Sequence, residues 1–150
     1  MIIRKGNIDD APTIVEYNLA LASETEDKEL DRATLTAGVE AILQDASKGE
    51  YFVAETDGRV IGQIMYTREW SDWRNGDLIW LQSVYVHADY RGQGVFAKLL
   101  GELQQLADEN PQVAGLRLYV EKENEAAQKA YLKNGFERPG YLVMERINGR

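Results

Sequence analysis

The chain has 150 residues, about the length of one domain, and we expect residues 1–150 to form a single domain. Hydrophobic residues make up 44% and charged residues 28%, which is typical of globular proteins with a packed core. The absence of cysteine excludes disulfides, thiolate metal ligands and a cysteine nucleophile, and the single histidine argues against a zinc site. A net charge of −8 disfavours nucleic acid and acidic membranes as partners, and no apolar run reaches the roughly 18 residues of a membrane span.

Hydrophobic spacing and turn residues predict ten elements in the order β-α-α-β-β-β-α-β-α-β. The first half has a strand at 2–4, a helix from Asn7 that ends within 23–27, a helix from Asp31 to Gly49, and strands at 51–55 and 59–68. The second half has a strand at 78–86, a helix from Gly94 to Asn110, a strand at 116–120, a helix from Asn124 to Gly135 and a last strand at 141–147. Asn7 with Asp10, and Asp31, are expected to cap their helices, and Asp57-Gly58 is expected to form a hairpin turn. A polar and aromatic loop is expected at 69–77. The strand–helix–strand unit at 78–121 predicts a parallel crossover. We therefore expect an α/β (α+β) fold, a mixed central sheet flanked by helices.

The segment that carries chemistry begins in the strand at 78–86 and enters a helix through Arg91-Gly92-Gln93-Gly94. The first turn of a helix has unpaired N–H groups and partial positive charge, and glycines allow a ligand to approach the backbone. Arg91 adds a cation that can bind an anion through two hydrogen bonds. This arrangement predicts a phosphate or pyrophosphate site. It matches neither the dinucleotide pattern, since Ala97 replaces the third glycine, nor the Walker A pattern.

Two segments resemble the GCN5-related N-acetyltransferase (GNAT) superfamily. Residues 91–96 resemble its motif A (Q/R-x-x-G-x-G/A), although Phe96 stands where the family has Gly or Ala, and residues 124–136 resemble its motif B. The expected order of elements is similar to the family fold over nearly the whole chain. The resemblance implies an acetyl-CoA-dependent N-acetyltransferase of the acyl-CoA N-acyltransferase fold without a metal, with a homodimer as one open state. A cytoplasmic location is expected from the missing targeting signals and from where acetyl-CoA is found.

The resemblance also implies a role for each matching residue. The strand backbone would pair with the pantetheine arm of acetyl-CoA, and the loop and first helical turn would hold the pyrophosphate, with Asn124 contacting the cofactor from the other side. The implied cofactor-binding residues are Val84, Tyr85, Val86, Arg91, Gly92, Gln93, Gly94, Val95, Phe96, Ala97 and Asn124. Tyr131 is the implied catalytic residue, which protonates the leaving thiolate. The backbone N–H of Val86 is expected to stabilise the oxyanion.

The acceptor is a primary amine of a small molecule or peptide, and its site is less clearly marked. Family members often place a glutamate base on the strand that here carries Trp80, Gln82 and Ser83, so the base is left open between another residue and water. The candidate acceptor-pocket residues are Glu24, Trp70, Trp73 and Gln82. Carboxylates and indole rings suit a cationic amine, although core packing is an equal interpretation for the tryptophans.

Two other functions fit the same residues. The missing strand glutamate is compatible with a non-catalytic module that binds or senses acyl-CoA. The glycine loop alone is compatible with a binder of another phosphorylated ligand.

Overall fold

The computed structural model describes residues 1–149, which divide by contacts into two compact units, Met1–Tyr119 and the residues from Val120 onward. The first unit contains β1 (Ile2–Lys5), α1 (Ala11–Glu26), α2 (Arg32–Gln44), β2 (Glu50–Thr56), β3 (Arg59–Ser71), β4 (Gly76–Val86), α3 (Val95–Glu109) and β5 (Val113–Leu118). The second unit contains α4 (Glu125–Lys133). Short 3-10 turns precede α1, β2 and α3.

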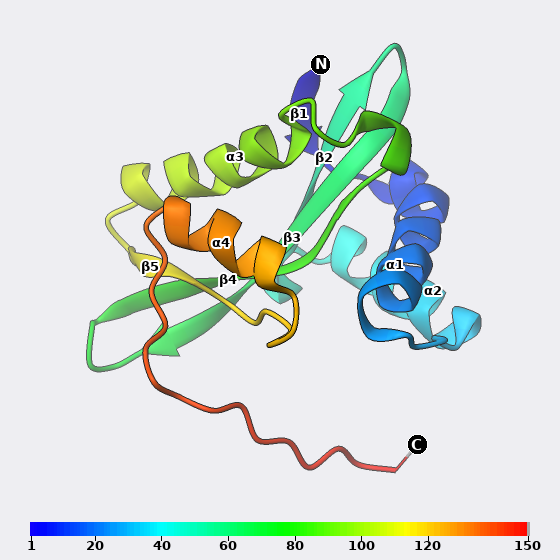
Figure 1. The fold of residues 1–150 in the computed structure, drawn as a ribbon. Coiled ribbons are helices and arrows are strands. Elements are labelled where there is room, and N and C mark those ends of the chain that lie inside the picture. Colours follow the sequence, from blue (N-terminus) through cyan, green and yellow to red (C-terminus); the bar gives the residue numbers. More distant parts are fainter. Residues whose placement is uncertain (150) are drawn as a thin grey trace. The chain divides into compact units, whose positions relative to one another are not determined.

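The sheet of the first unit is mixed, as expected (Figure 1). Its strand order is β1-β2-β3-β4-β5, with antiparallel pairing from β1 to β4. The last strand, β5, pairs parallel to β4, so the chain crosses from β4 to β5 through α3. The predicted parallel strand–helix–strand unit is confirmed.

Helices cover both faces of this sheet (Figure 1). Ile14 of α1 and Val39 of α2 belong to a buried cluster with Val53 of β2. Neighbouring strand residues point to opposite faces, so Ala54 and its cross-strand partner Gly62 face the other way. There a Cβ on Gly62 would lie 3.0 Å from Val95 Cγ1 of α3. The sheet is therefore covered by α1 and α2 on one face and by α3 on the other.

Several local signals in the sequence form as predicted. Asn7 and Asp10 make a reciprocal capping box, although it caps a 3-10 turn that leads into α1. Asp31 caps α2 by accepting a hydrogen bond from Thr34 N–H. Asp57 and Gly58 form the β2–β3 turn with φ of +50° and +75°. Each of these caps and turns depends only on residues close in sequence, so its structure does not change with the rest of the fold.

Element boundaries differ from the prediction in three places. The expected loop at 69–77 is mostly strand, because the β3–β4 ladder continues through Trp70↔Asp77 to Ser71↔Gly76. Helix α2 ends at Gln44, before the expected Gly49, and a 3-10 turn at Ala46–Lys48 follows it, whereas α1 ends at Glu26, within the expected stretch 23–27. Strand β5 begins at Val113, earlier than the expected 116.

The expected last strand at 141–147 is wrong. These residues form no strand in the structure, and Leu142 and Met144 are each 90% exposed. The run Tyr141-Leu142-Val143-Met144 has strand-forming side chains, but such residues favour a strand because they fit a pleated, half-buried surface. Side chains as exposed as Leu142 and Met144 do not lie on a half-buried surface, so their strand propensity has no effect here.

Candidate functional site

The turn from β4 into α3 has the geometry of an anion site. Gly92 and Gly94 have φ of +78° and +82°, which strain any residue with a Cβ. The N-cap of α3 is Gly94, which has no side chain to cap the helix, so the first-turn N–H groups of Val95 and Ala97 find no acceptor within the helix. A Cβ built on either glycine meets nothing within 4 Å, so the space around the loop is open. The loop can therefore receive a phosphate-like group on its backbone.

Strand β4 is unpaired on one side near this turn. It pairs with β5 from Asp77 to Leu81, and in the described residues no strand pairs with it on that side beyond Leu81. A bulge accompanies the change: Ser83 has φ of +51°, and the register with β3 shifts between Gln63 and Met65. The end of β4, with Val84, Tyr85 and Val86, thus offers a free backbone edge.

The peptide groups of Val86 point to that free edge. The N–H of His87 donates to Ile61 O of β3 at 2.9 Å, so the Val86 carbonyl across the same peptide points away from β3. In an extended residue N–H and C=O point to the same side, so the Val86 N–H does too. The expected oxyanion donor is therefore directed toward the open side of β4.

Arg91 joins the end of β4 to α1. Its Nε donates to Val86 O at 2.9 Å, and its Nη2 lies 2.8 Å from Glu24 Oε1. Its guanidinium carbon lies 5.3 Å from the ring centre of Tyr85, whose hydroxyl donates to Glu24 Oε2 at 2.6 Å. The Tyr85 hydroxyl and the Arg91 guanidinium hold the pKa of Glu24 below its usual range. Arg91 and Tyr85, which are expected to bind the cofactor, thus both contact Glu24, which is expected in the acceptor pocket.

The remaining acceptor candidates lie elsewhere on the sheet. Gln82 of β4 donates from Nε2 to Thr67 Oγ1 at 2.6 Å. Trp70 is 58% exposed opposite Asp77, and Trp73 is 88% exposed in the β3–β4 turn. Asp77 is eight residues before Tyr85, which corresponds to roughly 26 Å along a strand. The structure therefore does not bring Trp70 and Trp73 to Glu24.

The second unit holds the two motif B candidates. Asn124 caps α4, since its Oδ1 accepts a hydrogen bond from Ala127 N–H at 3.1 Å. The Tyr131 ring packs edge-on against Phe136 with 5.3 Å between ring centres. Burial raises the pKa of the Tyr131 hydroxyl to about 12, so this group stays protonated at neutral pH.

A buried polar network beneath the β4 bulge was not anticipated from the sequence. Gln63, with no exposed surface, donates from Nε2 to Ser83 O at 3.0 Å, and its Oε1 has no hydrogen-bond partner among the described residues. Asn18 of α1 donates to the Tyr51 hydroxyl at 3.0 Å, also in the buried interior. One signal existed: a glutamine within the apolar strand sequence at 60–66. The Gln63 side chain thus holds the carbonyl of Ser83, the residue with positive φ at the β4 bulge.

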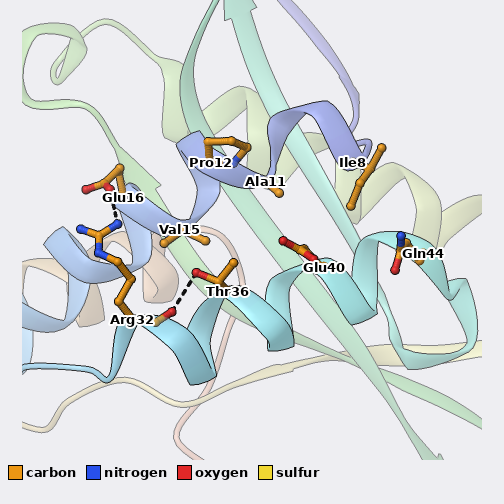
Figure 2. A pocket seen from close by; sticks show the side chains of 9 residues that line it. All are labelled: Ile8, Ala11, Pro12, Val15, Glu16, Arg32, Thr36, Glu40 and Gln44. Carbon is orange, nitrogen blue, oxygen red and sulfur yellow. Dashed lines mark hydrogen bonds and ion pairs between the residues drawn. The ribbon is translucent and has the colours of Figure 1, made fainter.

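A groove between α1 and α2 lies apart from these residues (Figure 2). Arg32 of α2 crosses it to an ion pair with Glu16 of α1. Its lining contains none of the expected cofactor or acceptor residues. The lining residues are Ile8, Ala11, Pro12, Val15, Glu16, Arg32, Thr36, Glu40 and Gln44.

The described residues contain no group of three or more His, Asp or Glu side chains arranged to hold a metal ion. Across residues 1–149, no helix has the length and apolarity that crossing a membrane requires.

Comparison with known proteins defines the class to which this fold and site belong. The model of the acetyltransferase (GNAT) family matches residues 15–136. The chain therefore belongs to the GNAT family, and the resemblance seen in the sequence is confirmed. A comparison with curated protein sequences gave no match.

Solved structures agree with this assignment. A possible acetyltransferase from Clostridium difficile 630 is 44% identical, with a TM-score of 0.93 over 99% of this chain and 98% of its own. An integron cassette protein from the mobile metagenome of Cole Harbour Salt Marsh is 20% identical, with a TM-score of 0.83 over 99% and 91%. Ribosomal-protein-alanine N-acetyltransferase from Brucella melitensis biovar Abortus 2308 is 21% identical, with a TM-score of 0.77 over 98% and 99%. The last two show the fold alone, which is the expected acyltransferase fold.

Proposed function

We propose that the chain is an acetyl-CoA-dependent N-acetyltransferase that moves the acetyl group directly to a primary amine in a ternary complex. In this proposal residues 1–150 act as one catalytic domain, in the cytoplasm, where acetyl-CoA is available. One observation carries it: the unpaired end of β4 leads into a helix N-terminus that no side chain caps. An extended amide chain ending in a pyrophosphate has the groups that such a strand edge and such a helix start bind.

The donor is held by backbone groups and one cation. Val84 and Val86 offer their peptide edges to the amides of the pantetheine arm, with Tyr85 between them. The pyrophosphate receives the N–H groups of Gly92, Gln93, Gly94, Val95, Phe96 and Ala97 and the Arg91 guanidinium. Motif B adds Asn124 as a further contact. Phe96 contributes only its N–H, so the larger side chain at this position is compatible with binding.

The chain's own groups then stabilise the reaction. The thioester supplies an activated acetyl group, and the Val86 N–H stabilises the oxyanion that forms when the neutral amine attacks the carbonyl carbon. The C–S bond then breaks to release the CoA thiolate, and the nitrogen loses its proton to water or to another residue. Tyr131 acts on the leaving thiolate. The pKa of its hydroxyl is about 12, far above the ~8.5 of an ordinary thiol. The proton therefore stays on Tyr131 at equilibrium, and the hydroxyl stabilises the thiolate by donating a hydrogen bond to it. Without cysteine no acyl-thioester of the enzyme forms, in keeping with direct transfer.

A panel of amines with detection of free thiol tests this function. The wild-type protein is expected to release CoA with at least one amine, and Arg91→Ala to bind acetyl-CoA about ten- to a hundredfold more weakly, the range of a charged hydrogen bond. Unchanged affinity in Arg91→Ala would show that Arg91 does not hold the pyrophosphate.

One observation favours the second candidate, an acyl-CoA sensor without turnover. From Leu78 to Val86, strand β4 carries no carboxylate that could take a proton from the amine. The sensor predicts the same acetyl-CoA binding but no thiol release with any amine of the panel.

A further inference from the structure

The contact between Glu24 and Arg91 occupies two groups that the reaction would need separately. Both carboxylate oxygens of Glu24 are engaged: Oε2 by the Tyr85 hydroxyl at 2.6 Å and Oε1 by Arg91 at 2.8 Å. The pair lies at the surface, with the Arg91 and Glu24 side chains 47% and 43% exposed. An exposed ion pair contributes little to stability, so its partners can exchange.

Arg91 also marks a place where a cation fits. Its guanidinium lies over the Tyr85 ring, 5.3 Å from the ring centre, while it bonds to Glu24. The Tyr85 ring is itself held by Tyr17 of α1, with 5.2 Å between ring centres, and Tyr17 donates to Val60 O at 2.6 Å. An aromatic face and a carboxylate together form a site for a positively charged group. This site lies one residue from Val86, the expected oxyanion donor.

Two anions compete for the single guanidinium. In the proposed function Arg91 holds the pyrophosphate, which carries more negative charge than one carboxylate and can likewise accept two hydrogen bonds from a guanidinium. Arg91 would then release Glu24 and also Val86 O, to which its Nε donates. Glu24 would keep the Tyr85 hydrogen bond and stay ionised. An alkyl amine, with a pKa of ~10.4, is mostly protonated at neutral pH and replaces the guanidinium with the same charge.

We propose that Glu24 and the Tyr85 ring form the binding site for the ammonium group of the acceptor, and that Arg91 fills this site until acetyl-CoA draws it away. This inference rests on the proposed function and narrows it: the acceptor is a cationic amine and binds after the donor. Glu24 binds substrate in this scheme, and no proton transfer is assigned to it.

Calorimetric binding of two probes tests the proposal: acetyl-CoA, and cadaverine in the presence or absence of CoA. Glu24→Gln keeps the size of the side chain and removes its charge, so it is expected to bind acetyl-CoA about two- to fivefold more tightly, the range of one exposed ion pair. Wild-type protein is expected to bind cadaverine more tightly by the same two- to fivefold with CoA present, since both effects measure one competing ion pair, and Glu24→Gln is expected to lose this enhancement.

Glu26→Gln is the matched control, because Glu26 is on the same helix and its ion pair is with Lys28. It is expected to behave as wild type with both probes. Unchanged acetyl-CoA affinity in Glu24→Gln, or equal cadaverine binding by wild type with and without CoA, overturns the inference and leaves the proposed function standing. Failure of every variant to bind acetyl-CoA overturns the proposed function, and the inference with it.

Discussion

The contact between Gly62 of β3 and the start of α3 gives the most specific prediction. A Cβ on Gly62 would lie 3.0 Å from Val95 Cγ1, 3.2 Å from Tyr85 O and 3.3 Å from Leu99 Cδ1. All three are tighter than ordinary van der Waals contacts, and the second is to backbone. In Gly62→Ala the first turn of α3 must therefore move away from the sheet.

Overpacking of this kind costs roughly 1–3 kcal/mol. For a chain of this length that corresponds to a fall in Tm of about 2–12 °C. Chemical denaturation and calorimetry measure it directly. Because Val95 begins the helix expected to bind pyrophosphate, acetyl-CoA affinity should fall in the folded variant as well.

Gly101→Ala is the control on the same helix. A Cβ there meets nothing within 4 Å, and Ala is the better helix former, so this variant should gain about 0.5–1 kcal/mol. The two Gly→Ala changes thus have opposite signs. Equal stability of Gly62→Ala and wild type, or loss of stability in both variants, would refute the packing argument.

Three further predictions concern other parts of the chain. Asp10→Asn removes a carboxylate that accepts from Arg4 at 2.8 and 2.9 Å and should cost about 2 kcal/mol in urea unfolding at pH 7. Burial opposes ionisation of Asp10, but hydrogen bonds from Arg4 and Asn7 lower its pKa below the usual value. The extra stability of wild type over Asp10→Asn is therefore lost as pH falls below ~4, and a stability difference that persists in acid would contradict the assignment. Gly49→Ala drives a Cβ into Tyr66 O at φ of +138° and should cost about 2–4 kcal/mol, whereas an unchanged Tm would count against this clash. Tyr131→Phe removes a hydrogen bond to a charged group and should lower kcat about ten- to a hundredfold in the thiol assay without changing the Kd of acetyl-CoA; equal kcat would exclude its role.

The features that sequence predicted well are local. A cap such as Asn7 or Asp31 acts on an N–H two or three residues away, and the Asp57-Gly58 turn requires only its own φ angles. The strand, glycine turn and helix start at residues 84–97 are also contiguous, so spacing alone predicted this local structure, while the anion site there stays a prediction. For the same reason the family could be identified from two short motifs.

The features that sequence missed depend on distant neighbours. The β3–β4 ladder extends over the expected loop because cross-strand pairing continues to Ser71↔Gly76, and the segment at 141–147 stays outside a sheet despite its composition. The pair of Glu24 and Arg91 joins residues 67 positions apart. Sequence periodicity does not reveal a contact between residues so far apart. Glu24 was therefore expected in the acceptor pocket, but its ion pair with Arg91, an expected cofactor residue, was not predicted.

Acetyl-CoA titration by calorimetry tests the central claim most directly, with 3′-dephospho-CoA and ADP as controls. The free edge at residues 84–86 and the uncapped start of α3 predict saturable binding that requires the pantetheine arm: ADP should bind far more weakly than acetyl-CoA. Equal affinity for ADP and acetyl-CoA would assign the glycine loop to another phosphorylated ligand. No binding at millimolar acetyl-CoA would contradict the donor site and the acetyltransferase function built on it.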